Sequence, residues 1–414
     1  MQIVYNYTVI LISWFIKPLV IFNKKLRLFV NGRKETFQKL KSIQKTDNVI
    51  WFHCASLGEF EQGRPVIEKY RNEFPNHKIV LTFFSPSGYE MRKNYSIADV
   101  VCYLPLDTIN NAKRFLDTIH PQLVIFVKYE FWPNILNELQ KRQIETLLIS
   151  GIFREDQLFF KKGIVSSFMK KSLSAFQHFF VQDDTSIELL HKIGYLNVTK
   201  SGDTRFDRVN EITKQDNSLQ FVSDFVQNKH VLVAGSTWKK DEELLIEYIN
   251  NYASDNEKFI IAPHNIKNID TLKKGFSKEV TLFSDKVKNN SANVLIIDTI
   301  GLLSKIYSYA NIAYIGGGFG AGIHNILEPA TFGMPLIIGP KFQKFNEAKD
   351  LINLKGCFVV KNTEDLRELL CQFKENGKSI KETANITKNY IASNIGATKC
   401  IISYIKKNSS ILQS

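Results

Sequence analysis

Short apolar runs alternate with stretches of helical periodicity along most of the chain. Runs that are rich in Val, Ile, Leu and Phe and end at turn residues are typical of buried strands. The runs in the first half are residues 48–53, 78–83, 100–104, 123–127, 146–149 and 179–181, with a shorter one starting at Val198. Those in the second half are residues 230–234, 259–262, 294–297, 312–315 and 335–338. Strands separated by helical stretches predict βαβ units and parallel sheets.

A polar stretch, residues 210–218, separates two halves that follow the same plan, and 414 residues suit two domains. We therefore expect an α/β fold of two doubly wound domains, with functional loops at the carboxyl ends of the strands. Two such domains facing a cleft could close over substrates. The expected regions are an N-terminal helix at 1–36, domains at 37–210 and 219–388, and a helical tail at 389–414.

The N-terminus differs from the rest of the chain, because Lys17 is its only charged residue before position 24 and basic residues follow. The stretch is marginal for a membrane span, which needs roughly 20 apolar residues. Two alternatives are an amphipathic helix in the membrane interface and a core helix of the first domain. The basic residues from position 24 onward would keep the rest of the chain on the cytoplasmic side of the membrane. We expect a membrane-associated helix and no removable signal peptide, since no small-residue cleavage site follows.

Residues 316–322 contain five glycines directly after the expected strand 312–315. Glycine permits positive φ and close approach of the backbone to a ligand. A helix expected to begin near His324 would offer unpaired N–H groups to a phosphate. The alternative is an ordinary glycine-rich turn. The spacing does not fit G-x-G-x-x-G, which argues against a dinucleotide site.

The net charge of +13 favours anionic partners such as acidic lipid headgroups or phosphorylated substrates. Basic runs with interleaved aromatics do not stand out, so nucleic acid is not an expected partner. Five scattered cysteines with no C-x-x-C pair indicate a reducing compartment rather than a disulfide framework. Metal-ligand spacing is likewise missing from the sequence, and we expect neither a metal nor a cofactor.

Several charged residues stand in loops after expected strands of the first half. Glu59 could take a proton from a substrate hydroxyl, although Ser56 and Glu59 also match a helix capping box. Arg205 could pair with a carboxylate or a phosphate. Lys128 and Glu130 lie in another of these loops, where charges are commonly just solvated.

In the second half, Ser236 and Thr237 resemble a small anion-binding turn, although they also suit the start of a helix. His324 and Asn325 follow the glycine-rich stretch, where a phosphate would lie. Glu328 is placed to accept hydrogen bonds from ribose hydroxyls.

Six motifs follow one another along the chain: HCASLGE at 53–59, KYEFWPN at 128–134, GDTRFDR at 202–208, AGST at 234–237, DTIGLL at 298–303 and HNILEPA at 324–330. In these motifs and their order the chain resembles 3-deoxy-D-manno-octulosonic acid (Kdo) transferases. The resemblance runs from the apolar N-terminus to about residue 351.

The resemblance implies a GT-B fold of two Rossmann-like domains. It implies inverting transfer of Kdo from CMP-Kdo to a lipid A disaccharide precursor, lipid IVA, at the cytoplasmic face of the inner membrane. By position, Glu59 matches the proton acceptor of the family, and Glu130 and Arg205 match residues that stabilise the transition state. The residues expected to bind the CMP donor are Ser236, Thr237, Pro263, His264, Ile300, Gly301, Leu302, His324, Asn325, Ile326, Leu327 and Glu328.

Two segments depart from the family pattern. The family often has Ala-Pro-Arg-His where this chain has residues 262–265, so a phosphate-contacting arginine is missing and His264 or Lys267 could replace it. The family often has Met-Gly-Glu where this chain has residues 300–302. Two other functions stay open from the sequence: a GT-B transferase using a UDP-sugar on a lipid or cell-wall acceptor, and a non-catalytic protein that binds nucleotides or lipids at the membrane surface.

Overall fold

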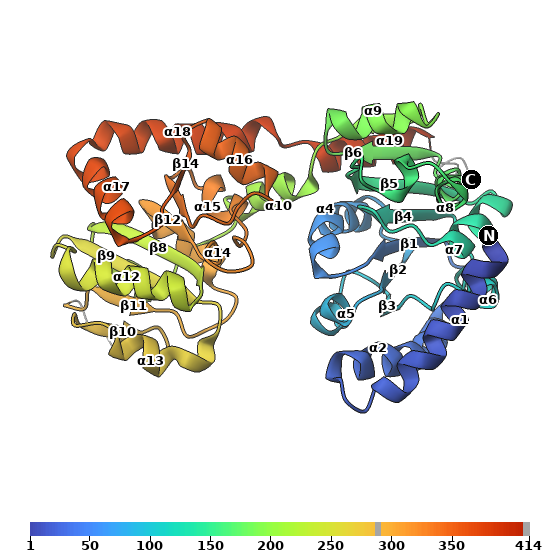
Figure 1. The fold of residues 1–414 in the computed structure, drawn as a ribbon, viewed down its shortest axis with the longest axis horizontal. Coiled ribbons are helices and arrows are strands. Elements are labelled where there is room, and N and C mark those ends of the chain that lie inside the picture. Colours follow the sequence, from blue (N-terminus) through green and yellow to red (C-terminus); the bar gives the residue numbers. More distant parts are fainter. Residues whose placement is uncertain (286–290, 409–414) are drawn as a thin grey trace. The chain divides into compact units, whose positions relative to one another are not determined.

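The computed structural model describes residues 1–285 and 291–408. The chain forms two compact units (Figure 1). Unit 1 comprises residues 1–207 together with the C-terminal segment that starts at Ile395, and unit 2 comprises residues 208–394. Each unit contains a seven-stranded sheet in which all pairings are parallel. The predicted α/β fold class is therefore confirmed.

The sheet of unit 1 has the order β3-β2-β1-β4-β5-β6-β7. Its strands are β1 (Val49–Cys54), β2 (Lys78–Phe83), β3 (Val100–Tyr103), β4 (Leu123–Val127), β5 (Glu145–Gly151), β6 (His178–Val181) and β7 (Val198–Lys200). Side chains alternate between the two faces of a strand. Trp51 of β1 therefore lies in the hydrophobic core on one face, and Phe52 lies in the core on the other.

The helices of unit 1 cover both of these cores. They are α1 (Gln2–Leu19), α2 (Lys24–Lys34), α3 (Thr36–Lys39), α4 (Leu57–Glu73), α5 (Pro86–Arg92), α6 (Ile109–Ile119), α7 (Pro133–Lys141), α8 (Ile164–Leu173), α9 (Asp184–Lys192), α10 (Thr204–Ile212) and α19 (Ala397–Asn408). Short 3₁₀ turns occupy Leu40–Ser42 and Leu158–Phe160. The unit boundary falls within α10, just after Asp207.

The sheet of unit 2 has the order β10-β11-β9-β8-β12-β13-β14. Its strands are β8 (His230–Thr237), β9 (Glu257–Pro263), β10 (Val280–Leu282), β11 (Val294–Ile296), β12 (Ile312–Ile315), β13 (Leu336–Ile338) and β14 (Cys357–Val359). The helices are α11 (Gln220–Val226), α12 (Lys239–Asn251), α13 (Ile269–Lys274), α14 (Leu303–Ile306), α15 (Leu327–Thr331), α16 (Asn346–Asn353), α17 (Thr363–Glu375) and α18 (Gly377–Ser393), with 3₁₀ turns at Ile266–Asn268 and Tyr307–Tyr309.

Every predicted strand is present, and two further strands, β10 and β14, were not predicted. Both have only three residues and lie at the edges of the second sheet, where an apolar run is too short to stand out. The helix expected to begin near His324 begins instead at Leu327, three residues later. It has five residues, since Pro335 and β13 follow closely.

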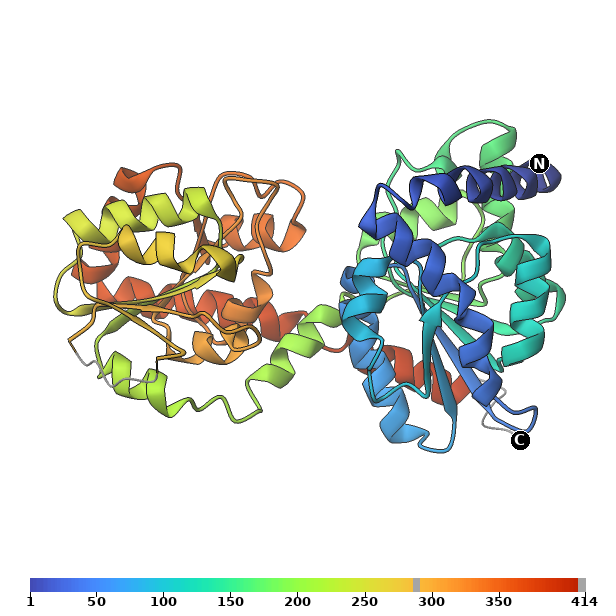
Figure 2. The ribbon, with the colours of Figure 1, turned by 90° about the horizontal axis from the view of Figure 1, so that it is seen from below.

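Residues 389–408 of the predicted tail 389–414 do not form one element, because α18 ends at Ser393 and Gly396 adopts a φ of 124° before α19; residues 409–414 lie outside the described residues. The carboxylate of Asp207 accepts hydrogen bonds from the backbone N of Gly396 at 2.6 Å and of Thr398 at 2.7 Å. A carboxylate at a helix start stabilises the unpaired N–H groups there. Helix α19 then packs against α4, and Figure 2 shows this red helix beside the blue elements of unit 1. The chain therefore returns to its first unit after completing the second.

Helix α1 is attached to unit 1 by one side and exposes apolar side chains on the other. The Tyr5 hydroxyl donates to Asp107 at 2.9 Å, and Asn6 accepts from the backbone N of Ile109 at 3.0 Å. Large apolar side chains that are more than half exposed include those of Ile3, Val4, Tyr7, Leu11, Ile12, Trp14 and Phe15. Within the described ranges, we find no helix with both the length and the apolar character needed to cross a bilayer. An interfacial position of α1 stays a prediction.

Replacing Ile401 with Ala should lower the free energy of unfolding of unit 1 by about 2–5 kcal/mol, because truncating a fully buried isoleucine leaves a cavity. Ser403→Ala on the exposed side of the same helix is the control and should change stability little. Urea denaturation followed by circular dichroism measures both. Equal stability of the two variants would contradict the packing of α19 on unit 1.

Candidate functional site

The loop after β1 places Glu59 in the first turn of α4. Ser56 precedes this helix, and its hydroxyl accepts from the backbone N of Gly58 at 3.3 Å and donates to Oε2 of Glu59. The Glu59 side chain is buried, with 7% of the residue exposed. Among the described residues, no hydrogen-bond donor contacts its other oxygen, Oε1. One carboxylate oxygen is therefore held in place and the other is available to a substrate.

The negative charge of Glu59 acts on the pKa values of side chains in the loop after β4. Burial lowers the pKa of Lys128, and the negative charge of Glu59 opposes that effect. Burial also raises the pKa of the Tyr129 hydroxyl, with Glu59 and Glu130 acting in the same direction. The Cys54 thiol has its pKa raised by burial and then by the same two carboxylates. The structure thus brings Glu59, Glu130 and Lys128 together at the carboxyl edge of the first sheet.

His53 lies 3.6 Å from Glu130, and two hydrogen bonds hold its ring. The indole N–H of Trp132 donates to Nε2 of His53 at 3.2 Å. Nδ1 lies 2.8 Å from Oγ1 of Thr82, whose own hydroxyl donates to the carbonyl of Phe52 at 3.4 Å. The His53 ring is therefore fixed between β2 and the loop that follows β4.

Arg205 is positioned by Asp203, a residue that sequence reasoning did not single out. Oδ2 of Asp203 accepts from Nε of Arg205 at 2.8 Å, and Oδ1 accepts from its backbone N at 2.9 Å. Gln62 of α4 donates to both oxygens of Asp203 at 3.2 Å, and the Thr204 hydroxyl donates to the carbonyl of Gln62. The start of α10 is therefore bound to the helix that carries Glu59. A carboxylate two residues before the arginine, inside GDTRFDR, was the available signal.

In unit 2, Asp241 joins the start of α12 to the glycine-rich stretch. It is fully buried, and its Oδ2 accepts from the backbone N of Trp238 and of Gly317, each at 2.9 Å. Its Oδ1 accepts from the hydroxyl of Tyr314 at 2.8 Å. Burial, with a further contribution from Asp241, raises the pKa of Tyr314 well above its usual range. A buried carboxylate needs such donors, because an unpaired buried charge is strongly destabilising.

Two of the glycines are explained by packing inside the protein. A Cβ on Gly316 would lie 2.4 Å from the carbonyl oxygen of Ser236, and one on Gly318 would lie 2.6 Å from the backbone of Gly339. At these two positions, the backbone approaches other protein backbone. The expectation that glycine here admits a ligand therefore does not account for them.

The rings of Trp238, His264 and His324 stack on one another. The centroids of Trp238 and His264 are 4.4 Å apart, and those of His264 and His324 are 4.8 Å apart. They lie beside a cavity of about 400 Å³ lined by residues 238–241 and by members of the glycine-rich stretch. Lys267, the other candidate to replace the arginine, lies in an exposed 3₁₀ turn.

Glu328 already has partners within unit 2. It accepts from the hydroxyl of Ser304 at 2.8 Å and from the side-chain amide of Asn325 at 3.0 Å. Asn325 also accepts from the backbone N of Leu327 at 3.1 Å and so holds the start of α15. Together with burial, the charge of Glu328 raises the pKa of Tyr307.

The remaining residues expected to bind the CMP-sugar differ in which of their groups a ligand could contact. Ile326 and Leu327 are fully buried, so only their backbone groups could meet a ligand. The Thr237 hydroxyl donates to Glu242 at 3.2 Å, while Ser236 adopts a φ of 55°.

Four other residues expected to bind the CMP-sugar lie at strand ends or in turns. Pro263 ends β9 directly before His264, and Ile300 is 83% exposed. Gly301 has a φ of 95°, and Leu302 immediately precedes α14.

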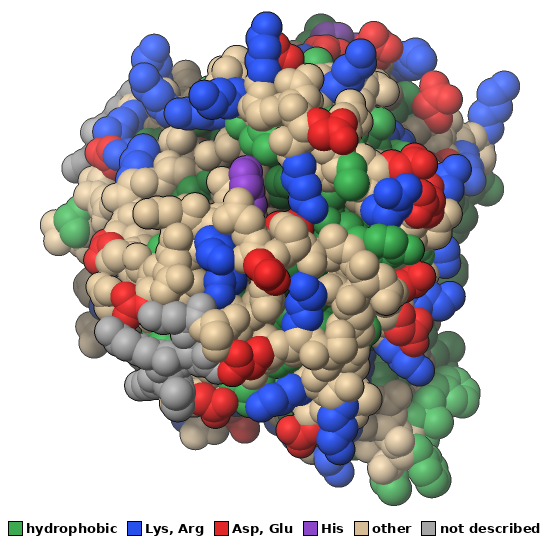
Figure 3. Space-filling view, turned by 90° about the vertical axis from the view of Figure 1, so that its left-hand side faces the viewer, with side chains coloured by type: hydrophobic (Ala, Val, Ile, Leu, Met, Phe, Trp, Pro, Cys, Tyr) green, Lys and Arg blue, Asp and Glu red, His purple; other side chains and the backbone are tan. Residues whose placement is uncertain are grey.

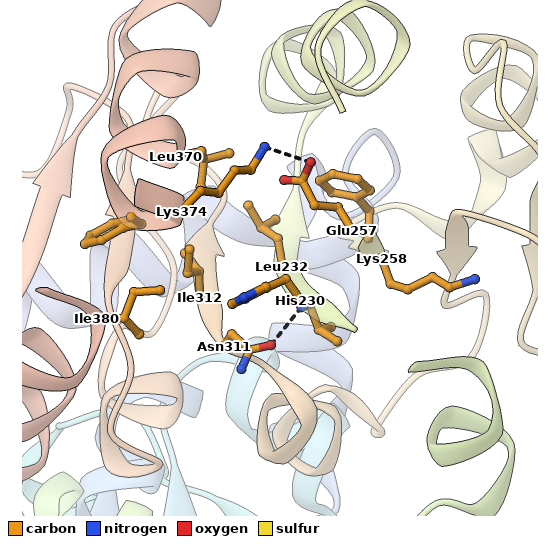
Figure 4. A pocket seen from close by; sticks show the side chains of 12 residues that line it. His230, Leu232, Glu257, Lys258, Asn311, Ile312, Leu370, Lys374 and Ile380 are labelled. Atoms are coloured by element: carbon orange, nitrogen blue, oxygen red, sulfur yellow. Dashed lines mark hydrogen bonds and ion pairs between the residues drawn. The ribbon is translucent and has the colours of Figure 1, made fainter. Parts of the chain in front are cut away.

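A second cavity lies at the opposite edge of this sheet, where β8, β9 and β12 begin (Figure 4). Its volume of about 30 Å³ admits a water molecule but not a nucleotide. Lys374 pairs with Glu257 at 2.8 Å, and Asn311 accepts from the backbone N of Val231 at 2.8 Å. We do not consider it a ligand site.

Figure 3 shows the face of unit 2 that lies at the left of Figure 1, where acidic and basic side chains are interspersed. The net positive charge is therefore not concentrated on this face. Across residues 1–285 and 291–408, no group of His, Cys, Asp and Glu side chains is arranged to hold a metal ion.

Replacing Asp241 with Ala should lower the free energy of unfolding of unit 2 by at least about 2 kcal/mol, because each buried donor left without a partner costs roughly 1–3 kcal/mol. Glu243→Ala, at a side chain that is 60% exposed on the same helix, is the control. Chemical denaturation of both variants measures the difference. A wild-type midpoint for Asp241→Ala would contradict this role.

The chain resembles known proteins over most of its length. A family model described as 3-deoxy-D-manno-octulosonic-acid transferase (kdotransferase) matches residues 31–208. A 3-deoxy-D-manno-octulosonic acid transferase of Aquifex aeolicus (strain VF5) is 30% identical over 359 residues, which cover 84% of this chain and 92% of the relative.

Solved structures of low sequence identity share the fold. A UDP-GlcNAc 2-epimerase from Neisseria meningitidis bound to UDP-GlcNAc has a TM-score of 0.63 at 16% identity, covering 87% of this chain and 100% of that one. MurG of Acinetobacter baumannii has a TM-score of 0.54 at 12% identity, covering 87% and 99%. These likenesses agree with a GT-B fold. The 30% identity to the Aquifex relative, over nearly its whole length, shows that the chain belongs to the 3-deoxy-D-manno-octulosonic acid transferase family.

Proposed function

We propose that this chain transfers Kdo from CMP-Kdo to a lipid A disaccharide precursor, lipid IVA, with inversion at the anomeric carbon. The observation that carries the proposal is the environment of Glu59. Its carboxylate is buried beside Lys128 and Glu130, one oxygen is fixed by Ser56, and the other is available to a substrate. A general base must present such an oxygen to the proton that it removes.

In the proposed reaction, Glu59 takes the proton from the primary hydroxyl of the acceptor glucosamine. The oxygen then forms a bond to the anomeric carbon of Kdo, and the bond from that carbon to the phosphate oxygen of CMP breaks. The electron pair leaves with CMP. The transition state resembles an oxocarbenium ion, and fixed charges aimed at such a state are often the largest catalytic contribution.

Arg205 and Glu130 would supply these charges in unit 1. Asp203 holds Arg205 through two hydrogen bonds, while the side chain of Arg205 stays 32% exposed. A guanidinium held in this way is suited to the carboxylate of Kdo or to a phosphate.

The proposed donor site lies in unit 2, at the carboxyl ends of β8, β9 and β12. His264 and His324 would meet the phosphate, and Glu328 would accept from the ribose. The residues at 236–237, 263, 300–302 and 325–327 would contribute through backbone groups or shape, because several of their side chains are buried or already bonded.

We also propose that α1 and α2 lie at the cytoplasmic face of the inner membrane, against anionic lipids. A groove of about 340 Å³ runs between these helices and is lined by Ile16, Phe29, Arg33 and Lys34 among others. The Arg33 guanidinium lies 3.6 Å from the centroid of Phe29. Burial lowers the pKa of Arg33 to about 9, so it stays protonated at neutral pH. A cation beside an apolar groove suits an acidic lipid.

The direct test incubates the full chain with lipid IVA and either CMP-Kdo or UDP-sugars, and measures the product by mass spectrometry. We expect a mass gain of Kdo from CMP-Kdo only. Transfer from a UDP-sugar alone would replace the proposal with another GT-B activity, and absence of transfer from any donor would indicate a binding protein.

Glu59→Gln should lower turnover in this assay by about 10²–10⁴, because the amide cannot accept the proton. CMP affinity should stay unchanged, since the base lies in the other unit. Glu68→Gln, farther along the same helix, should retain turnover. Near-normal turnover in Glu59→Gln would rule out Glu59 as the base.

A double change on α1, Trp14→Glu with Phe15→Glu, should reduce binding to vesicles of anionic phospholipid by about tenfold or more, since each large apolar side chain contributes roughly 1.5–3 kcal/mol when buried. Ile164→Glu changes a comparably exposed apolar residue elsewhere in unit 1 and is the control. Co-flotation with vesicles measures the bound fraction. Equal flotation of all three proteins would remove α1 from the membrane contact.

A further inference from the structure

Trp238 makes a specific contact with His324 inside the ring stack of unit 2. Its indole N–H donates to Nε2 of His324 at 2.8 Å, and the two ring planes are only 10° apart. His264 stacks on both rings, with interplanar angles of 18° to Trp238 and 28° to His324. The three rings come from different segments, so the arrangement is set by the fold of unit 2.

The hydrogen bond fixes where the His324 proton lies. Indole can only donate, so the imidazole nitrogen that accepts from it must be unprotonated. A neutral imidazole then carries its single proton on the other nitrogen, Nδ1. Protonation of Nε2 would place two hydrogens between the same two nitrogens and would break the contact. Trp238 therefore favours one tautomer and also opposes the charged form.

The charged surroundings of His324 act in the same direction. Burial lowers the pKa of His324, His264 lowers it further, and Asp241 partly opposes both. Lys239 and Lys240 line the adjoining cavity, and the exposed Lys239 pairs with Glu243 at 3.8 Å. Burial and His264 therefore disfavour an imidazolium at this position, whereas Asp241 favours it.

Nδ1 of His324 makes no hydrogen bond to any residue that the structure describes. It is also absent from the buried atoms without partners in the described parts of the chain, so the N–H is accessible. An accessible donor beside a cavity of about 400 Å³ is suited to an anionic oxygen of a ligand.

We propose that Trp238 is a positioning residue that holds His324 as a neutral Nδ1–H donor to the phosphate of the CMP-sugar. The assignment rests on the proposed function. The His324 N–H also gives the phosphate a partner in a chain that has His264 where the family often has arginine. Leaving CMP would then be held by a hydrogen bond in which only the phosphate oxygen is charged, which is weaker than one between two opposite charges and favours release.

The direction in which CMP affinity should change with pH follows from this arrangement. Trp238→Phe keeps an aromatic ring but removes the N–H donor, so Nε2 of His324 becomes able to accept a proton as pH falls. The imidazolium attracts phosphate, and CMP affinity should then rise as pH decreases. Because a hydrogen bond between two opposite charges is stronger than one in which only the phosphate is charged, we expect a gain of roughly 3–10-fold over wild type between pH 8 and pH 5.5. The CMP phosphate itself gains a proton at about pH 6, so the two proteins are compared with each other at each pH.

The first experiment needs no variant and no ligand. Long-range ¹H–¹⁵N spectra of the histidine rings in the full-length protein report the tautomer and the charge of His324 from pH 5.5 to pH 8. We expect the Nδ1–H tautomer throughout in wild type, and titration of the same ring in Trp238→Phe. An Nε2–H or a charged His324 in wild type at pH 7 would overturn the proposal, whatever CMP does.

The second experiment measures CMP affinity by calorimetry over the same pH range. A second imidazole, that of His264, lies in the same ring stack, so Trp238→Phe is compared with Trp238→Phe/His264→Asn. A pH dependence that persists in the double variant belongs to His324 and supports the proposal. An unchanged pH dependence in Trp238→Phe would overturn the phosphate role of His324. Wild-type protein with the expected tautomer that binds UDP but not CMP would instead count against the proposed donor, and with it against a role for His324 in CMP binding.

Discussion

A buried carboxylate surrounded by hydrogen-bond donors holds each candidate site in place. In unit 1, Asp203 accepts from Arg205 and from Gln62 on α4. In unit 2, Asp241 accepts from two backbone N–H groups and a tyrosine hydroxyl. A buried negative charge is tolerated only where such donors converge. Each carboxylate therefore fixes the positions of segments that are distant in sequence.

These carboxylates can join distant segments because the strands within each sheet are parallel. All strand ends of one kind lie at one edge, so the loops that follow β1 and β4 meet there, as do those that follow β8 and β12. Helix α4 extends this arrangement, since it carries Glu59 in its first turn and Gln62 one turn later. The geometry around Glu59 thus depends on contacts that begin at residue 203 and reach back across most of unit 1.

In both units an indole N–H also donates a hydrogen bond to a histidine ring. Trp132 donates to Nε2 of His53, and Trp238 donates to Nε2 of His324. In each case the indole N–H donates to one ring nitrogen and so fixes the orientation of the imidazole. In unit 1, this contact holds the His53 ring 3.6 Å from Glu130. Aromatic residues beside the motifs therefore orient polar side chains as well as pack.

Apolar runs and motif order are local properties of the chain, and they were sufficient to predict the α/β class, the positions of the longer strands and the family. They could not reveal β10 and β14, whose three-residue runs carry too little pattern, nor the attachment of α19 to unit 1 through Asp207. Three facts emerged from the three-dimensional structure alone: Gly316 and Gly318 are required by protein packing, Asp203 orients Arg205, and Trp238 contacts His324. Each of these facts is a distance between segments separated along the chain, and periodicity and spacing report only on neighbours in sequence.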